Sequence, residues 1–497
     1  MEFKRASGVL MHIASLPSEN GIGSLGKEAY KFVDFLKETG QTYWQILPVC
    51  PTSYGDSPYQ GFSTFAGNPY FIDLDILCEQ GYLKPQDYKD INWGETAEKV
   101  DYSLIYTNRN RVFQTLYNNF KENVPSEFTQ FCKQNEFWLE DFALFMAVKD
   151  CFGGKKYTEW DNGISIREQT AVDYYKTICQ ERIDYYKMLQ FFFFSQWYDL
   201  KDYANRNGIK IIGDLPIYVA EDSADVWSNP ECFKLDKNRK PKEVAGCPPD
   251  CFSQDGQLWG NPVYDWRYMK STGYDWWIKR LRTSFEIYDI VRIDHFRGFE
   301  AFYCIKYGEK TAKNGKWRKG PDIGFWKEVK RQLGDLPVIA EDLGFLTEKV
   351  HILLKKSGFP GMKVLQFAFD SGSKNAYLPH NYNKNCVVYT GTHDNDTIMG
   401  WLETVSDNTL DFAKKYLNSK NSDLRKPLII SAMSSVADTC ILTMQDLIGL
   451  GNDARMNTPS TLGGNWSWRA KPDYITEDIK KMLLDLTEIY GRERQTQ

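Results

Sequence analysis

The chain alternates short apolar runs, rich in β-branched and aromatic residues, with segments long enough to form helices. Such alternation is typical of a parallel sheet whose faces are covered by helices. Three intervening segments have a helical pattern: residues 28–40, 274–288 and 324–334, the first closing with Gly40 as a stop signal. The apolar runs cover residues 7–15, 43–49, 209–219, 288–296, 336–342, 362–369, 385–394 and 438–447.

Eight runs favour a closed barrel. Eight parallel strands can close a (β/α)8 TIM barrel whose interior is filled by side chains, and insertions can lengthen such a chain to the 497 residues seen here. We therefore predict an α/β fold in which residues 1–497 form a single barrel with inserted, mainly helical subdomains. The insertion at residues 53–205, between the second and third runs, is far longer than an ordinary connection. An open doubly wound sheet is the alternative.

Acidic residues follow four of the runs at their carboxyl ends. In a barrel these ends meet at one mouth, where active sites are built. A single acid of this kind is more often a helix cap or half of a structural ion pair. Four together favour a carboxylate-based active site, which would make the barrel the catalytic unit. The acids, with an arginine and two histidines beside them, are Asp214 in the third run, Asp294 beside Arg292 and His295 in the fourth, Glu341 and Asp342 at the end of the fifth, Asp394 beside His393 at the end of the seventh, and Asp396 just beyond it.

Clustered carboxylates with few other reactive groups suit the chemistry of glycosidic bonds, which needs one ionised and one protonated carboxyl group. Arg292 and Asp294 are two positions apart and would share one face of a strand, so we expect the guanidinium to lower the pKa of Asp294, as a nucleophile requires. Glu341 follows an apolar stretch, which should raise its pKa, as a general acid requires. The pattern does not choose between Asp394 and Asp396.

Aromatic residues in the segments 53–65 and 253–262 could stack on sugar rings, although ordinary core packing explains any one of them equally well. The segment GIGSLG (21–26) matches a dinucleotide fingerprint, but it lies six residues after its strand, and the next strand ends without an acid for a ribose. DNDTIMG (394–400) begins like a calcium loop but lacks the later ligands. We therefore predict no cofactor and no metal.

The composition limits the cellular location and the kinds of partner that the sequence predicts. With 61 basic and 66 acidic residues the net charge is −5, so no general attraction to nucleic acid or anionic membrane is implied. No run approaches the roughly 18 apolar residues of a membrane span, and the first apolar run is broken by His12 and lacks a cleavage site for a signal peptide. Eleven cysteines without repeated spacing favour reduced thiols. We expect a cytoplasmic protein without nucleic-acid or membrane partners.

Several ordered motifs resemble the amylomaltase, or disproportionating-enzyme, family of 4-α-glucanotransferases, relatives of the α-amylases. They are GIGSLG, GDSPYQGFSTFAGNPYFIDL (55–74), GDLPIYV, AGCPPDCFSQDGQLWGNP (245–262), VRIDHFRG, IAEDLG, GTHDNDT and QDLIGLGNDARMNTPSTLGGNW (445–466). The resemblance covers nearly the whole chain. It implies a (β/α)8 barrel with inserted subdomains and no separate C-terminal β-domain, and a loop over the active site at residues 245–262.

Carried over to this sequence, the resemblance makes Asp294 the nucleophile, Glu341 the general acid/base and Asp394 the third carboxylate. It places Ser57, Tyr59, Asp214, Arg292 and His393 on the donor side, and Asp250, Gln257, Trp259 and Asn465 nearer the acceptor or in the loop over it. One departure is Cys247 and Cys251, where similar sequences usually carry an apolar residue and a tyrosine.

The resemblance implies transfer of α-1,4-glucan segments between maltooligosaccharides or starch-type glucans by a retaining double displacement, with glucose as an acceptor. An α-glucan hydrolase would use the same carboxylates and is the first alternative. A non-catalytic glucan-binding protein is the second, although such a protein would usually have lost Asp294 or Glu341.

Overall fold

The computed structural model describes residues 4–53, 55–249, 254–344, 346–461 and 463–494. Eight parallel strands form one sheet in the order β10, β11, β12, β1, β2, β3, β6, β9. The sheet closes on itself, because the backbone N–H of Ala340 in β9 donates a 2.9 Å hydrogen bond to the carbonyl of Pro360, directly before β10. The strands are β1 Ala6–Leu10, β2 Tyr43–Gln45, β3 Lys210–Pro216, β6 Ile290–Asp294, β9 Val338–Ala340, β10 Gly361–Val364, β11 Cys386–Tyr389 and β12 Thr439–Thr443.

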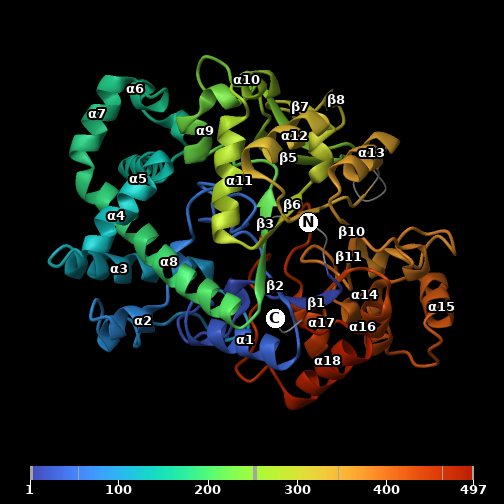
Figure 1. Ribbon diagram of the computed structural model, residues 1–497. Helices are drawn as coiled ribbons and strands as arrows, with labels where there is room; N and C mark the ends of the chain where they lie inside the picture. The colour runs from blue at the N-terminus through green and yellow to red at the C-terminus, as the bar shows by residue number, and fades with distance from the viewer. Residues whose placement is uncertain (1–3, 54, 250–253, 345, 462, 495–497) are drawn as a thin grey trace.

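Each of the eight predicted runs overlaps one of these strands, so the predicted (β/α)8 barrel is confirmed. The helices around it include α1 Lys27–Glu38, α11 Asp275–Ile287, α12 Asp322–Leu333, α13 Glu348–Ser357, α16 Arg425–Ser434 and α18 Glu477–Ile489 (Figure 1). The three helices predicted from sequence correspond to α1, α11 and α12. Gly40 ends the first with a φ of +70°, which favours glycine. The connection from β10 to β11 contains only short 3₁₀ turns, η7 Leu365–Phe367 and η8 Pro379–Asn381.

The long segment between β2 and β3 is helical. It forms α2 Leu74–Glu79, α3 Tyr102–Phe120, α4 Ser126–Gln134, α5 Glu136–Cys151, α6 Asn162–Ser165, α7 Gln169–Ile178 and α8 Gln180–Arg206. Figure 1 shows these helices to the left of the barrel. To its right lie the helices α14 Ile398–Thr404 and α15 Asp407–Tyr416, and α17 Met444–Ile448 follows β12 in the chain.

A four-stranded antiparallel sheet in the order β5, β4, β7, β8 was not predicted. Its strands are β4 Glu243–Cys247, β5 Gln257–Pro262, β7 Ala301–Lys306 and β8 Lys316–Lys319, and the short helices α9 Ala224–Ser228 and α10 Trp266–Ser271 lie before and after the β4–β5 pair in the chain. The expected loop at 245–262 therefore has strands at both ends. In Figure 1 this sheet lies on the side toward which β3 points.

The strands separate two cores. Ile290 of β6 and Ile339 of β9 pack inside the barrel, whereas Val291 and Ile293 pack in the shell between the barrel and its helices. Because side chains alternate between the two faces of a strand, Arg292 and Asp294 share the inner face with Ile290. The barrel therefore directs these two charged side chains into its interior.

Candidate active site

Asp294 and Glu341 occupy neighbouring positions at the carboxyl ends of adjacent strands. β6 and β9 pair in parallel with Ile293 opposite Ala340, and the N–H of Glu341 donates a 3.0 Å hydrogen bond to the carbonyl of Ile293. Neighbouring strands lie about 4.8 Å apart. Glu341 continues the alternation two residues after the inward-facing Ile339, so both carboxyl groups face the barrel mouth.

The guanidinium of Arg292 holds two acids. Its Nη1 donates to both carboxylate oxygens of Asp214, at 2.7 and 2.6 Å, and its Nη2 donates to Oδ1 of Asp294 at 3.0 Å. The side chains of Arg292 and Asp214 are 4% and 0% exposed, but that of Asp294 is 32% exposed. Arg292 and Asp214 thus form a buried pair, and Asp294 is the carboxylate of this group that a ligand can reach.

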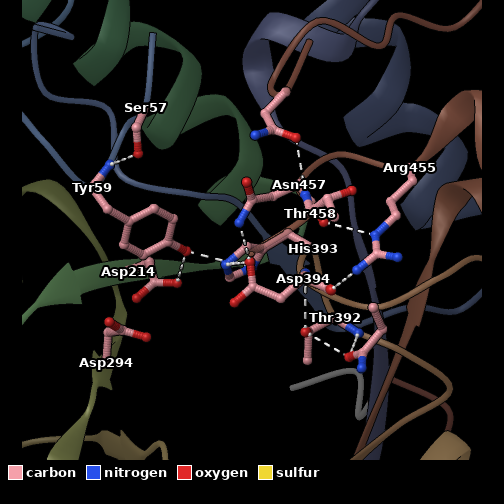
Figure 2. A network of polar contacts seen from close by, with 12 residues as sticks. Ser57, Tyr59, Asp214, Asp294, Thr392, His393, Asp394, Arg455, Asn457 and Thr458 are labelled. Carbon is pink, nitrogen blue, oxygen red and sulfur yellow. Dashed lines mark hydrogen bonds and ion pairs between the residues drawn. The ribbon is translucent and has the colours of Figure 1, made fainter. Parts of the chain in front are cut away.

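Tyr59 closes the network from the segment between β2 and the inserted helices. Its hydroxyl donates a 2.8 Å hydrogen bond to Oδ2 of Asp214 and lies 3.4 Å from Nδ1 of His393 (Figure 2). Burial raises the pKa of Tyr59 well above its usual value, so the phenol keeps the proton that it donates.

Glu341 has the surroundings of a general acid. Burial, and then the Asp294 carboxylate, raise the pKa of Glu341 to about 7, against the opposing effect of Arg292 and two backbone hydrogen bonds. Those bonds come from the N–H groups of His295 and Leu343, each 2.7 Å from one carboxylate oxygen. His295 adopts a left-handed conformation with φ of +54°, an uncommon backbone state for a non-glycine residue, directly after the strand.

The expected lowering of the pKa of Asp294 was wrong in sign. Burial raises the pKa of Asp294; Arg292 lowers it, and the carboxylates of Asp214 and Asp394 add to the rise. The lowering of the Asp294 pKa by Arg292 does not outweigh the rise caused by burial, because the guanidinium also pairs with Asp214. Asp294 nevertheless contacts a cation directly, and no ion pair to Glu341 is present among the described residues. The direct contact with a cation therefore distinguishes Asp294 from its neighbour Glu341.

Asp394 and Asp396, which the sequence pattern left undecided, have different surroundings. Oδ1 of Asp394 accepts a 2.6 Å hydrogen bond from Asn457 and lies 3.4 Å from Nε2 of His393, and its side chain is 45% exposed. Asp396 instead forms an ion pair with Arg455. Figure 2 shows the Asp394 carboxylate on the side of Tyr59 and Asp214, with Arg455 on the other side of the Asp394 backbone. Asp394 is therefore the acid that faces the other carboxylates.

Aromatic rings border this group. The Tyr59 ring stacks on His393 with centroids 5.0 Å apart, and Trp466 lies 5.7 Å from Tyr59 and 5.9 Å from His393. Trp466 and Asn457 were not predicted as site residues, although both lie within the motif 445–466. On the side of β5, Trp259 packs edge-on against His295 at 4.8 Å. Its indole N–H donates to Oε1 of Gln257 at 3.0 Å.

The remaining predicted contacts are less direct. Oγ of Ser57 accepts a 3.2 Å hydrogen bond from the N–H of Tyr59 and so orders the turn before it. Oδ1 of Asn465 accepts a 3.0 Å bond from the N–H of Thr458, which closes a turn next to Asn457. Cys247 ends β4. Asp250 and Cys251 lie outside the described residues.

Within the described ranges, no group of three or more His, Cys, Asp or Glu side chains is placed to hold a metal ion. The same part of the chain contains no helix long and apolar enough to cross a membrane.

Known proteins share this architecture along the whole chain. The sequence pattern of 4-alpha-glucanotransferases matches residues 11–476. The chain belongs to the 4-alpha-glucanotransferase family. The 4-alpha-glucanotransferase of Clostridium butyricum is 52% identical over 97% of this chain and 100% of its own length, and that of Thermus thermophilus is 45% identical over 99% and 100%. The amylomaltase of Streptococcus agalactiae in complex with acarbose has a TM-score of 0.97 at 45% identity, covering 99% of this chain and 100% of its own.

These relationships confirm the predicted family and activity. The chain is an enzyme, a 4-alpha-glucanotransferase of the amylomaltase type, and the comparisons favour transfer over the hydrolase and the non-catalytic alternatives.

Proposed function

We propose that the enzyme transfers α-1,4-glucan segments with Asp294 as nucleophile, Glu341 as general acid/base and Asp394 as the third carboxylate. The observation that carries this assignment is the contrast between two neighbouring carboxyl groups. The carboxylate of Asp294 accepts a 3.0 Å hydrogen bond from the guanidinium of Arg292. Burial and the negative charge of Asp294, in contrast, raise the pKa of Glu341 to about 7. One group is suited to attack as an anion and the other to donate a proton.

In the first step, an oxygen of Asp294 attacks the anomeric carbon of the donor glucan. The bond from that carbon to the leaving 4-oxygen breaks, and the Glu341 proton passes to this oxygen. Adjacent positions on neighbouring strands suit the separation of about 5–5.5 Å between the carboxyl groups of retaining enzymes. The product is a covalent glucosyl enzyme, with Glu341 left as an anion.

In the second step, Glu341 removes the proton from a 4-hydroxyl of the acceptor, whose oxygen attacks the anomeric carbon and releases Asp294. Water in place of the acceptor would give hydrolysis. Gln257 and Trp259, which β5 positions, would favour transfer by retaining a sugar while excluding water.

The donor sugar is held by the groups around Asp294. Arg292 and Asp214 are too buried to hold more than the edge of a sugar, so their role is to position Asp294 and Tyr59. Tyr59, His393 and Asp394 supply a ring face and hydroxyl partners, and Ser57 orders the Tyr59 turn. On the acceptor side, Trp259 supplies a ring beside His295, and Gln257 and Asn465 supply hydrogen-bonding groups. A role for Asp250 rests on the family resemblance alone.

The substrates on this proposal are maltooligosaccharides and starch-type α-1,4-glucans, with glucose as an acceptor. The acarbose complex of the Streptococcus agalactiae amylomaltase supports this class, and acarbose should inhibit this enzyme competitively.

We also propose a cytoplasmic location. The ten described cysteines are free thiols, as a reducing compartment favours; cell fractionation would test it.

Products from pure protein and maltotriose, in the presence of EDTA and without added cofactor, test the activity. Glucose together with a ladder of longer maltooligosaccharides at constant total reducing ends is the expected result. Rising reducing ends would identify a hydrolase. Asp294→Asn should abolish turnover and largely preserve glucan binding, whereas unchanged turnover in that variant would remove Asp294 from the role of nucleophile.

A further inference from the structure

A groove of about 700 Å³ lies on the outer side of the barrel. Its lining residues come from the inserted helices α4 and α5, the middle of α8 and the exposed face of α11. None of the lining residues belongs to the candidate active site. The volume lies in the range of about 300–1,000 Å³ typical of ligand sites.

Aromatic rings from α4, α5 and α8 line this groove. Phe137 and Tyr198 are 50% and 43% exposed, unusual for large rings that share one depression. Tyr198 stacks on the buried Phe194 with centroids 5.7 Å apart, and Phe131 packs against Phe191 at 5.8 Å. The rings are therefore held in place from behind and present fixed apolar faces.

Polar groups without partners lie among and opposite these rings. Gln134, Ser195, Arg282 and Glu286 line the groove, and within the described part of the chain their side chains make no hydrogen bond or ion pair. Lys279 is already paired with Asp275 at 2.8 Å. One free cation and one free anion leave the groove close to neutral, which suits an uncharged ligand with many hydroxyl groups.

We propose that this groove is a second binding site for linear α-1,4-glucan, separate from the active site. A glucan offers apolar ring faces and hydroxyl edges together, which match the aromatic rings and the unpartnered polar groups of this lining. This inference rests on the proposed function, because glucan is then the polymer that the enzyme meets. Holding a long chain here would raise the local concentration of donor at the barrel mouth. For a short oligosaccharide the groove would not raise the concentration of donor at the barrel mouth.

Binding is tested in the Asp294→Asn background, so that the probe is not consumed. The probe is amylose embedded in native gels at graded concentrations. Adding Phe137→Ala with Tyr198→Ala should weaken retardation about tenfold, since each stacked ring contributes roughly 0.5–1.5 kcal/mol. Ser195→Trp, which fills the groove from α8 without removing core contacts, should do the same. Tyr174→Ala, at a 59% exposed ring on α7, is the matched control and should have no effect.

Kinetics with Asp294 intact give an independent measurement. The groove variants should raise KM for amylose severalfold and leave kcat and KM for maltotriose unchanged. Equal retardation and equal KM for amylose in parent and both groove variants would overturn the second site. A parent enzyme inactive on maltotriose would instead refute the proposed function, and the gel measurement would still report on the groove.

Discussion

The raised pKa of Glu341 makes a quantitative prediction about folding stability. Burial and the Asp294 carboxylate raise this pKa from 4.5 to about 7. Between these two pH values the unfolded chain loses the proton while the folded chain keeps it, so the fold is progressively destabilised as the pH rises, and by a constant amount above pH 7. At about 1.36 kcal/mol per pKa unit, the full effect is about 3 kcal/mol.

Glu341→Gln removes this dependence, because the amide has no proton to lose. In the parent, the N–H groups of His295 and Leu343 each donate a 2.7 Å hydrogen bond to the Glu341 carboxylate. The amide of the variant can accept only one of these two hydrogen bonds, and the resulting loss of stability is similar at every pH. The stability of the variant relative to the parent should therefore rise by about 3 kcal/mol between pH 4.5 and pH 8. With an unfolding entropy of about 1 kcal/mol/K for a chain this long, the Tm difference should shift by about 3 °C.

Differential scanning calorimetry at pH 4.5, 6, 7 and 8 measures this shift. Glu403→Gln, at an exposed glutamate on α14, controls for the change in net charge. A Tm difference between Glu341→Gln and the parent that stays constant from pH 4.5 to 8 would show that the folded protein does not raise the pKa of Glu341. The assignment of the general acid would then lose its electrostatic basis.

Three further predictions address activity and folding. Because Glu341 must carry its proton in the free enzyme, kcat/KM for maltotriose should fall about tenfold per pH unit above pH 7, and a flat profile from pH 6 to 9 would contradict this role. Asp394→Asn should lower kcat by about 100-fold or more, whereas Asp396→Asn, which loses an ion pair to an arginine, should lower kcat less than tenfold; equal losses would refute the distinction. Lys149→Met should destabilise the fold by about 3–5 kcal/mol in urea unfolding, because it leaves Asp222 buried without its cation, and adding Asp222→Asn should restore most of that loss.

The barrel could be predicted because its strands are apolar runs separated by helices, a pattern visible along the chain. The small antiparallel sheet could not. β8 is the segment Lys316–Lys319, which has three basic residues and a single tryptophan and therefore neither an apolar run nor an apolar–polar alternation. β5, Gln257–Pro262, contains a glycine and a proline, residues that count against a strand. Both strands are specified by their partners in space.

The cluster of carboxylates at the barrel mouth could be predicted for a similar reason, since an acid at the end of an apolar strand stands out. Asn457 and Trp466 were not, because they lie in irregular chain after β12, where no periodicity marks the direction of a side chain. Their contacts to Asp394 and Tyr59 join segments more than 60 residues apart. Only the folded chain brings them together.

The error about Asp294 shows how non-local charge decides the electrostatics of the site. The sequence paired Arg292 with Asp294, two residues away, but Asp214, 78 residues earlier, takes both of the shortest hydrogen bonds from the guanidinium. The positive charge of Arg292 is thus largely balanced by a buried anion. With Glu341 protonated, the charge of Asp294 remains only partly neutralised at the barrel mouth. An anion in that state can stabilise a developing oxocarbenium ion, which a fully neutralised carboxylate would do poorly.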